Sequence, residues 1–316
     1  MPRLAVPSFA GVDLAAWASA NSARLSHELD VFGAILFRGF EVNTPERLQE
    51  ISERMCGSLC AYAERRSPRT VLAGDVLTST HFPADQSILF HNEMSFAREW
   101  PMRLFFGCLR PADEGGWTPL ADSRRVFARI PAATRAAFLE RGVRYVRNYH
   151  RGVGLSWRET YQTEDVAEVE AICQRSVVGY AWVDGGRLRT WQDRHAIAAH
   201  PRTGETVWFN QAHFFHLRSL PDDTAAAIRR NYPEEDLPQQ TYFADGSAIA
   251  DASIDEINAA YAAEAVGFAW ERGDLLVLDN MLVAHARTPY RGPRLIAVTL
   301  GDLYSPGRVE NGRADP

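Results

Sequence analysis

The sequence places a histidine and a carboxylate two positions apart. His91 and Glu93 flank Asn92 in the stretch 90–94. In a β-strand, residues i and i+2 point to the same face, so an extended conformation here would aim both side chains at one point. The best candidate for a third ligand is His285, far along the chain. Two histidines and one carboxylate, with open positions, are typical of the facial triad of a non-haem Fe(II) oxygenase.

A second pair of residues suits an anionic co-substrate. Thr118 follows a glycine pair, and Arg294 stands at the start of an apolar stretch. The planar guanidinium of arginine binds a carboxylate through two parallel hydrogen bonds. We therefore expect Arg294, assisted by the Thr118 hydroxyl, to hold the far carboxylate of a dicarboxylic co-substrate.

Other candidate residues have weaker signals. The stretch 62–80 is rich in Arg, Ser and Thr, and its Arg66 and Arg69 could contact substrate, because loops often carry binding residues; the alternative is a solvated basic loop. Asn210 and His216 are candidates for lining a substrate cavity. A second metal site at His213 and His216 is a less favoured interpretation, since the chain has nine histidines.

Composition excludes several classes of partner. The chain has 316 residues and a net charge of −6, without a long run of like charge, whereas nucleic-acid sites are basic. The first residues lack the apolar stretch of a signal peptide, and no apolar run approaches the length of a membrane helix, so we expect neither. Four cysteines are too few for a disulfide scaffold. We expect a cytoplasmic protein without nucleic-acid or membrane partners; the sequence does not determine its oligomeric state.

The elements that must position these residues alternate between helices and short strands. Helical spacing predicts a helix over 13–29, and a second helix from Pro45, capped by Thr44, to about Cys60. Further helices are expected over 164–174, 221–231 and 251–265, and short apolar runs, several with a period of two, predict strands between the helices. We predict a mainly β fold with inserted helices and a double-stranded β-helix (jelly-roll) core. Residues 1–316 are expected to form one domain, with a helical insertion around 132–178.

Several short motifs together resemble a known family, and each alone is weak. They are Thr78-Ser79-Thr80, Pro83-Ala84-Asp85-Gln86, His91-Asn92-Glu93-Met94-Ser95-Phe96, Trp100-Pro101, Gly115-Gly116-Trp117-Thr118-Pro119, Ala121-Asp122-Ser123-Arg124, His200-Pro201, Thr203-Gly204-Glu205, Trp208-Phe209-Asn210-Gln211 and Leu278-Asp279-Asn280-Met281 through His285 to Pro293-Arg294. With these motifs, the chain resembles the taurine dioxygenase/TfdA family of Fe(II)- and 2-oxoglutarate-dependent dioxygenases. It is most similar to the SyrP-like branch, which is associated with nonribosomal peptide assembly.

The resemblance implies roles for the candidate residues. His91, Glu93 and His285 would bind Fe(II), while Arg294 and Thr118 would hold the co-substrate 2-oxoglutarate, with O2 as the oxidant. Arg291 is a rival anchor, because the wider family often has two adjacent arginines where this chain has Arg294 followed by a leucine.

The resemblance also implies an activity. Many members of the wider family have Asp where Glu93 stands, whereas Glu is typical of the SyrP-like and clavaminate-synthase-like branches. A carboxylate at this position favours hydroxylation or desaturation over halogenation. The implied function is hydroxylation of an amino acid, tethered to a peptidyl carrier protein, in natural-product (antibiotic) biosynthesis. The alternatives are a dioxygenase of a free amino acid or another small acid, and a non-catalytic jelly-roll binding protein.

Overall fold

One layer of the molecule is a seven-stranded sheet. The computed structural model describes residues 2–60 and 70–306. The sheet has the strand order β1-β2-β15-β6-β18-β4-β3. Its strands, in that order, are Arg3–Ala5, Ala34–Phe37, Leu275–Asp279, Trp100–Arg110, Leu295–Tyr304, Val76–Thr78 and Val71–Ala73.

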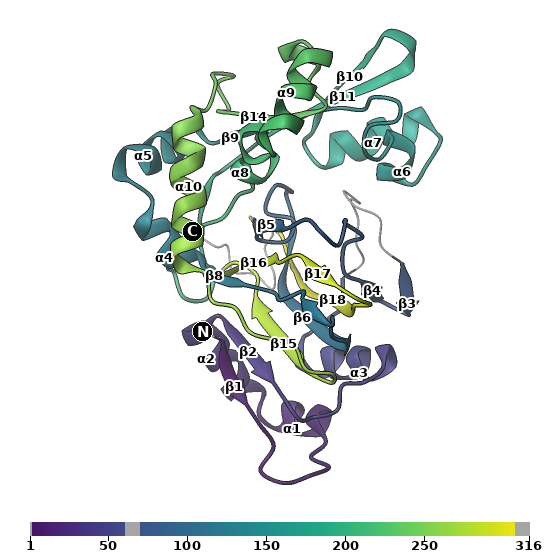
Figure 1. Ribbon diagram of the computed structural model, residues 1–316, viewed down its shortest axis with the longest axis vertical. Helices are drawn as coiled ribbons and strands as arrows, with labels where there is room; N and C mark the ends of the chain where they lie inside the picture. The colour runs from purple at the N-terminus through teal and green to yellow at the C-terminus, as the bar shows by residue number, and fades with distance from the viewer. Residues whose placement is uncertain (1, 61–69, 307–316) are drawn as a thin grey trace.

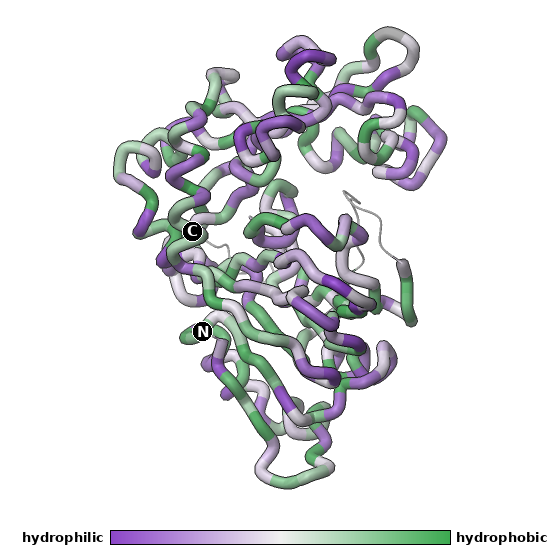
Figure 2. The backbone as a smooth tube through the Cα atoms, viewed as in Figure 1, coloured by the Kyte–Doolittle hydropathy of each residue, from purple (hydrophilic) through white to green (hydrophobic). Residues whose placement is uncertain are grey.

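Both faces of this sheet are buried, which explains why its central strands are continuous apolar runs. In β15, Leu275 and Val277 pack into one core cluster, whereas Leu276 and Leu278 pack into the other. The first cluster is covered by the N-terminal helices α1 (Leu14–Ala20), α2 (Ser22–Phe32) and α3 (Pro45–Met55). Figure 1 shows these helices in the lower part of the molecule, beside the large sheet, and Figure 2 shows the apolar stretches of β2 and β15.

A smaller sheet lies on the other face and completes the jelly roll. Its order is β5-β16-β8, with the strands Ile88–His91, Val283–Arg287 and Leu120–Asp122. The rings of Phe106 on β6 and His285 on β16 lie 5.1 Å apart, so the two sheets pack face to face here. The predicted mainly β jelly roll with inserted helices is therefore confirmed. The other paired strands are β7 (Glu114–Gly115) with β17 (Tyr290–Arg291), and β12 (Ile197–Ala199) with β13 (Thr206–Trp208).

A third layer, between β8 and β15 in the chain, lies at the opposite end of the molecule from α1–α3 (Figure 1). It contains a four-stranded sheet of order β10-β11-β9-β14. Its strands are Gly179–Val183, Arg187–Arg194, Val143–Asn148 and Gln239–Tyr242. Its helices are α4 (Ser123–Arg129), α5 (Ala132–Arg141), α6 (Trp157–Tyr161), α7 (Val166–Arg175), α8 (Ala212–Phe215), α9 (Asp222–Asn231) and α10 (Asp251–Glu264), with 3-10 turns at Asp184–Gly186, Leu217–Ser219 and Glu234–Asp236.

This layer extends beyond the helical insertion expected around 132–178, because β9 within that range pairs with β11 and β14 outside it. One hydrophobic core cluster runs from Tyr145 and Phe215 in the third layer to Leu276 in the large sheet. On this continuous core, we propose that residues 1–316 form a single domain.

The helices near the N-terminus differ in their bounds from those predicted. The Thr44 side chain accepts a hydrogen bond from the Arg47 N–H and Pro45 opens α3, as expected, but the helix ends at Met55 rather than near Cys60. The single helix expected over 13–29 is two helices, which meet at Asn21. None of the helices in residues 2–60 and 70–306 combines the length and apolarity that a bilayer-spanning helix needs.

Candidate metal centre

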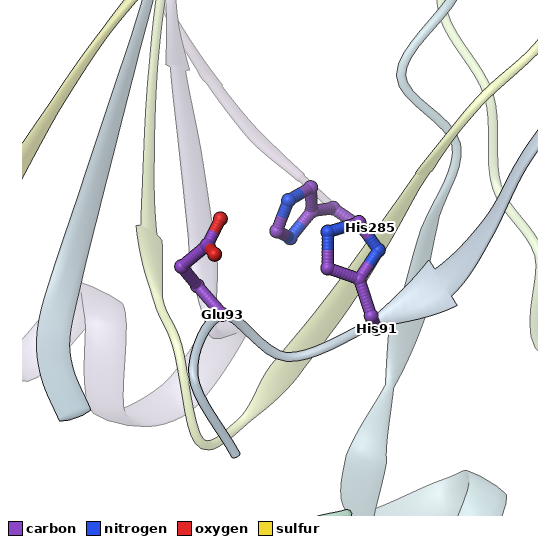
Figure 3. A group of neighbouring side chains, drawn as sticks. All are labelled: His91, Glu93 and His285. Carbon is purple, nitrogen blue, oxygen red and sulfur yellow. The ribbon is translucent and has the colours of Figure 1, made fainter. Parts of the chain in front are cut away.

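Two histidines from neighbouring strands face each other at the centre of the smaller sheet. His91 ends β5, and His285 on β16 is its direct cross-strand partner. Their ring centroids are 4.3 Å apart. Glu93 completes the group, and one ligand atom from each of the three residues lies within 4.8 Å of the others (Figure 3). Two atoms that share one first-row metal ion, each about 2.1 Å from it, are separated by at most about 4 Å. The arrangement therefore fits a single ion after small side-chain adjustments.

Glu93 reaches this point by a different route from the one expected. The extended conformation predicted for 90–94 is wrong, because β5 ends at His91 and the chain turns at once. Met94 takes a left-handed conformation, with φ of 58°, and the Ala97 N–H bonds back to its carbonyl. The carboxylate thus projects from a turn and not from the pleat of a strand.

A hydrogen bond selects which nitrogen of His91 can bind a metal. His91 Nδ1 lies 2.9 Å from the carbonyl oxygen of Leu89. A carbonyl only accepts, so Nδ1 carries the proton and Nε2 keeps its lone pair. Such a bond from the far nitrogen is the usual support for a metal-ligating imidazole. The donor set fits Fe(II), since two imidazoles and one carboxylate are its ligands in facial-triad oxygenases.

The turn that leads from β15 to His285 is fixed by a buried carboxylate. Asp279 Oδ1 accepts the backbone N–H groups of Met281 and Leu282. Its Oδ2 is 3.0 Å from His200 Nε2, which donates, because the other nitrogen of His200 accepts the Thr203 N–H. These bonds close the turn tightly, so that β16 starts at a defined place.

The expected co-substrate residues lie beside the three candidate ligands. Thr118 and Arg294 line the same small cavity as His91, Glu93 and His285. Thr118 is buried, and its hydroxyl accepts a 3.1 Å bond from the indole N–H of Trp270. Indole only donates, so the proton of the Thr118 hydroxyl remains available for an acceptor such as a carboxylate.

Arg294 is a desolvated cation. Its Nε donates to the Gly116 carbonyl at 2.9 Å. Among the described residues, no carboxylate forms an ion pair with it. Burial, reinforced by the neighbouring Arg287 guanidinium, lowers its pKa to about 10. Because the charged form is poorly solvated here, a carboxylate ligand would stabilise it.

Sequence reasoning missed Arg287 as a cavity residue. It stands two positions after His285 on β16, so the strand period offered a signal. It is only 6% exposed, which excludes a surface role. Its Nη atoms donate to the carbonyls of Phe82, Pro83 and Gln86. It lines both the metal cavity and an adjoining cavity of ≈ 380 Å³.

The other predicted residues lie elsewhere. Arg291 has an 83% exposed side chain, 3.4 Å from Glu114, and does not line the metal cavity. The Asn210 side chain is fully buried and bonds to the backbone of Ala196 and Ala212, which makes it a structural amide. His216 is buried, and its Nδ1 accepts the Arg218 N–H. Neither Asn210 nor His216 is among the residues that line the metal cavity.

Arg66 and Arg69 lie outside the described residues. A second metal site at His213 and His216 has no support, since the candidate cluster in the described part of the chain consists of His91, Glu93 and His285. His213 is instead a buried structural residue. Its Nε2 donates to the Phe90 carbonyl at 2.8 Å, and burial lowers its pKa to about 4.

The chain is similar to known proteins along most of its length. The family model described as taurine catabolism dioxygenase TauD, TfdA family matches residues 3–300. The chain is 36% identical to the dapdiamide synthesis protein DdaC of Enterobacter agglomerans, over 89% of this chain and 86% of that protein. It is 31% identical to a clavaminate synthase-like protein of Arabidopsis thaliana, over 85% and 81%.

A solved structure shares the fold. It is an asparagine oxygenase in complex with Fe(II), 2S,3S-3-hydroxyasparagine and succinate, with a TM-score of 0.56, 15% identity, and coverage of 90% of this chain and 79% of that one.

Proposed function

The chain belongs to the TauD/TfdA family of Fe(II)- and 2-oxoglutarate-dependent dioxygenases, and on that premise we propose that it hydroxylates an amino acid tethered to a peptidyl carrier protein. Membership makes it an enzyme that uses Fe(II), 2-oxoglutarate and O2, which sets aside the non-catalytic alternative. The observation that carries the proposal is the convergence of His91, Glu93 and His285 in one cavity with Thr118 and Arg294.

In this proposal, the three converging side chains hold the iron, with His91 binding through Nε2. Arg294 and the Thr118 hydroxyl bind the far carboxylate of 2-oxoglutarate, so that its 2-oxo acid end points toward the metal. The bound iron, with 2-oxoglutarate and O2, supplies the oxidation of a substrate C–H bond, and 2-oxoglutarate becomes succinate and CO2. The apolar walls formed by Phe106, Ile296 and Val298 limit the access of bulk water.

The proposed pathway is natural-product biosynthesis. It is supported by 36% identity to a protein whose name assigns it to dapdiamide synthesis. The carrier-bound substrate is supported by the sequence resemblance to the SyrP-like branch, and hydroxylation by the presence of Glu93. A cytoplasmic location belongs to the same proposal, since all four cysteines are free.

A free amino acid or another small acid is a second candidate substrate, and one observation favours it. Arg287 and Arg294 both line the metal cavity, and neither pairs with a carboxylate among the described residues. If Arg294 holds 2-oxoglutarate, the charge of Arg287 remains without a counter-ion. The carboxylate of a free acid would balance it, whereas a carrier-bound thioester has no such carboxylate.

The first experiment tests the metal site. Wild type and His91→Ala are compared in succinate formation from 2-oxoglutarate with Fe(II), ascorbate and O2. We expect succinate from the wild type and at least a hundredfold less from the variant, because two ligands cannot hold the ion in the same geometry. Equal rates would reject these three residues as the iron site.

The second experiment separates the two substrates. A panel of amino acids is offered both free and loaded on a phosphopantetheinyl carrier protein, and products are identified by mass spectrometry after hydrolysis. A mass gain of one oxygen on the carrier-bound form alone supports the tethered substrate. Turnover of the free acid alone rejects it and supports the second candidate.

A further inference from the structure

Glu93 is held by a side chain from the other sheet. β5 ends at His91, which pairs with His285, so Glu93 lies beyond the end of the strand. There, Asn280 Oδ1 accepts the Glu93 N–H at 2.7 Å, and Asn280 Nδ2 donates to the Glu93 carbonyl at 2.8 Å. An antiparallel strand pair exchanges the same two bonds between opposite residues. The amide of Asn280 therefore replaces the peptide of a missing strand.

The orientation of this amide is determined by its surroundings. Nδ2 also donates to the Pro101 carbonyl at 2.8 Å, so two carbonyls face it and an N–H faces Oδ1. If the amide were rotated by 180°, its oxygen would face the two carbonyls and its NH2 group would face the Glu93 N–H, so all three hydrogen bonds would be lost. Asn280 has no exposed surface, and water does not reach these bonds to replace them.

The backbone of Asn280 is equally well fixed. Its N–H bonds to the Met102 carbonyl at 2.8 Å, and its own carbonyl accepts Asn92 Nδ2 at 2.7 Å. Asn280 is the first residue after β15, which is an inner strand of the seven-stranded sheet. The position of Glu93 thus depends on the large sheet, whereas His91 and His285 belong to the small one.

We propose that Asn280 is a positioning residue for the metal centre, which holds Glu93 at the distance from the two histidines that one divalent ion requires. This inference rests on the proposed function of the three ligands. The left-handed Met94 gives such a device a purpose, because this backbone conformation is not held by local preference in a residue other than glycine. Without Asn280, the turn at 92–94 would relax and the carboxylate would move away.

The test compares two buried asparagines. In Asn280→Asp, a carboxylate oxygen faces the carbonyls of Glu93 and Pro101 in place of Nδ2. Asn148→Asp is the matched control, since Asn148 is 3% exposed and its Nδ2 also donates to two backbone carbonyls, those of Glu235 and Leu237. Mn(II), a redox-stable probe for the Fe(II) site, is titrated into metal-free protein, and free Mn(II) is measured by electron paramagnetic resonance.

We expect Asn280→Asp to raise the Kd for Mn(II) about 10- to 100-fold, the range found when residues that support metal ligands are changed. Asn148→Asp should lower the melting temperature and leave this Kd within about twofold. If Asn280→Asp does not fold, Asn280→Ser, which adds no charge, is measured in the same way. A folded Asn280 variant with wild-type affinity overturns the inference, as does an equal loss in the control.

A third arm separates this inference from the proposed function. His91→Ala must lose Mn(II) binding if the three residues form the site. Wild-type affinity in His91→Ala would reject the site itself. Loss in His91→Ala, together with wild-type affinity in the Asn280 variants, would reject only the role of Asn280.

Discussion

His91 and His285 are opposite residues of one antiparallel strand pair, with their ring centroids 4.3 Å apart. Their separation is therefore set by the strand register rather than by flexible loops. A register shift of one residue would turn one imidazole to the opposite face of the sheet. Glu93 lacks this protection, because it lies beyond the end of β5 and depends on contacts to the other sheet.

The first prediction concerns which arginine binds 2-oxoglutarate. Arg294→Met should raise the apparent KM for 2-oxoglutarate about 30- to 100-fold, corresponding to roughly 2–3 kcal/mol for a charge-assisted contact. Arg291→Met is the control and should change it less than about twofold, since Arg291 is exposed. The measurement is succinate formation against 2-oxoglutarate concentration. The opposite ranking of the two variants would make Arg291 the anchor.

The second prediction concerns Trp270, whose N–H orients the Thr118 hydroxyl. Trp270→Phe should weaken 2-oxoglutarate binding about fivefold, near 1 kcal/mol for one hydrogen bond. Thr118→Val should have a similar or larger effect. Because both changes remove the same interaction, the double variant should be little worse than Thr118→Val. Calorimetric titration of the metal-loaded protein with 2-oxoglutarate gives the affinities. If the two changes lowered the binding free energy additively in the double variant, Trp270 would not act through Thr118.

The third prediction concerns pH. Burial holds the pKa of His213 at about 4, below the ordinary value of 6.5. The unfolded chain therefore binds a proton below pH 6.5 that the folded chain does not, and stability falls as the pH decreases from 6.5 to 4. The full shift corresponds to about 3 kcal/mol. His213→Gln, which keeps a donor for the Phe90 carbonyl, should lack this component of the pH dependence.

Urea unfolding of metal-free protein at several pH values measures the effect of His213. Both proteins should lose stability at low pH through their other groups, so the difference between them is the relevant quantity. If the difference in the free energy of unfolding between wild type and His213→Gln stayed constant from pH 7 to 4, His213 would not be kept neutral in the folded state.

The fourth prediction concerns the loop at 82–86, which Arg287 holds through three carbonyls and Tyr290 through its N–H to the Ala84 carbonyl. Arg287→Lys keeps the charge but loses the planar set of donors. Amides in 82–88 should then exchange hydrogen at least about tenfold faster, as measured by mass spectrometry. Arg291→Lys should leave this exchange unchanged. Wild-type protection in Arg287→Lys would mean that the loop is held by other contacts.

The sequence by itself indicated which residues could carry the chemistry. Residue type and motif were enough to name His91, Glu93, His285, Thr118 and Arg294 as candidates, because a metal ligand or a carboxylate anchor allows few side chains. The apolar runs of β2 and β15 likewise indicated buried strands, since both faces of the large sheet are covered.

Only the tertiary structure decided how these residues meet. The spacing of two predicted Glu93 on the same strand face as His91, but the strand ends at His91, two residues before Glu93. A quoted motif contained Asn280 and the strand period placed Arg287 near His285, but neither signal showed what these side chains contact. Trp270 gave no signal, because an indole serves many structural purposes. Their roles depend on partners far away in the chain, and hydrogen bonds of that kind exist only once the two sheets have packed.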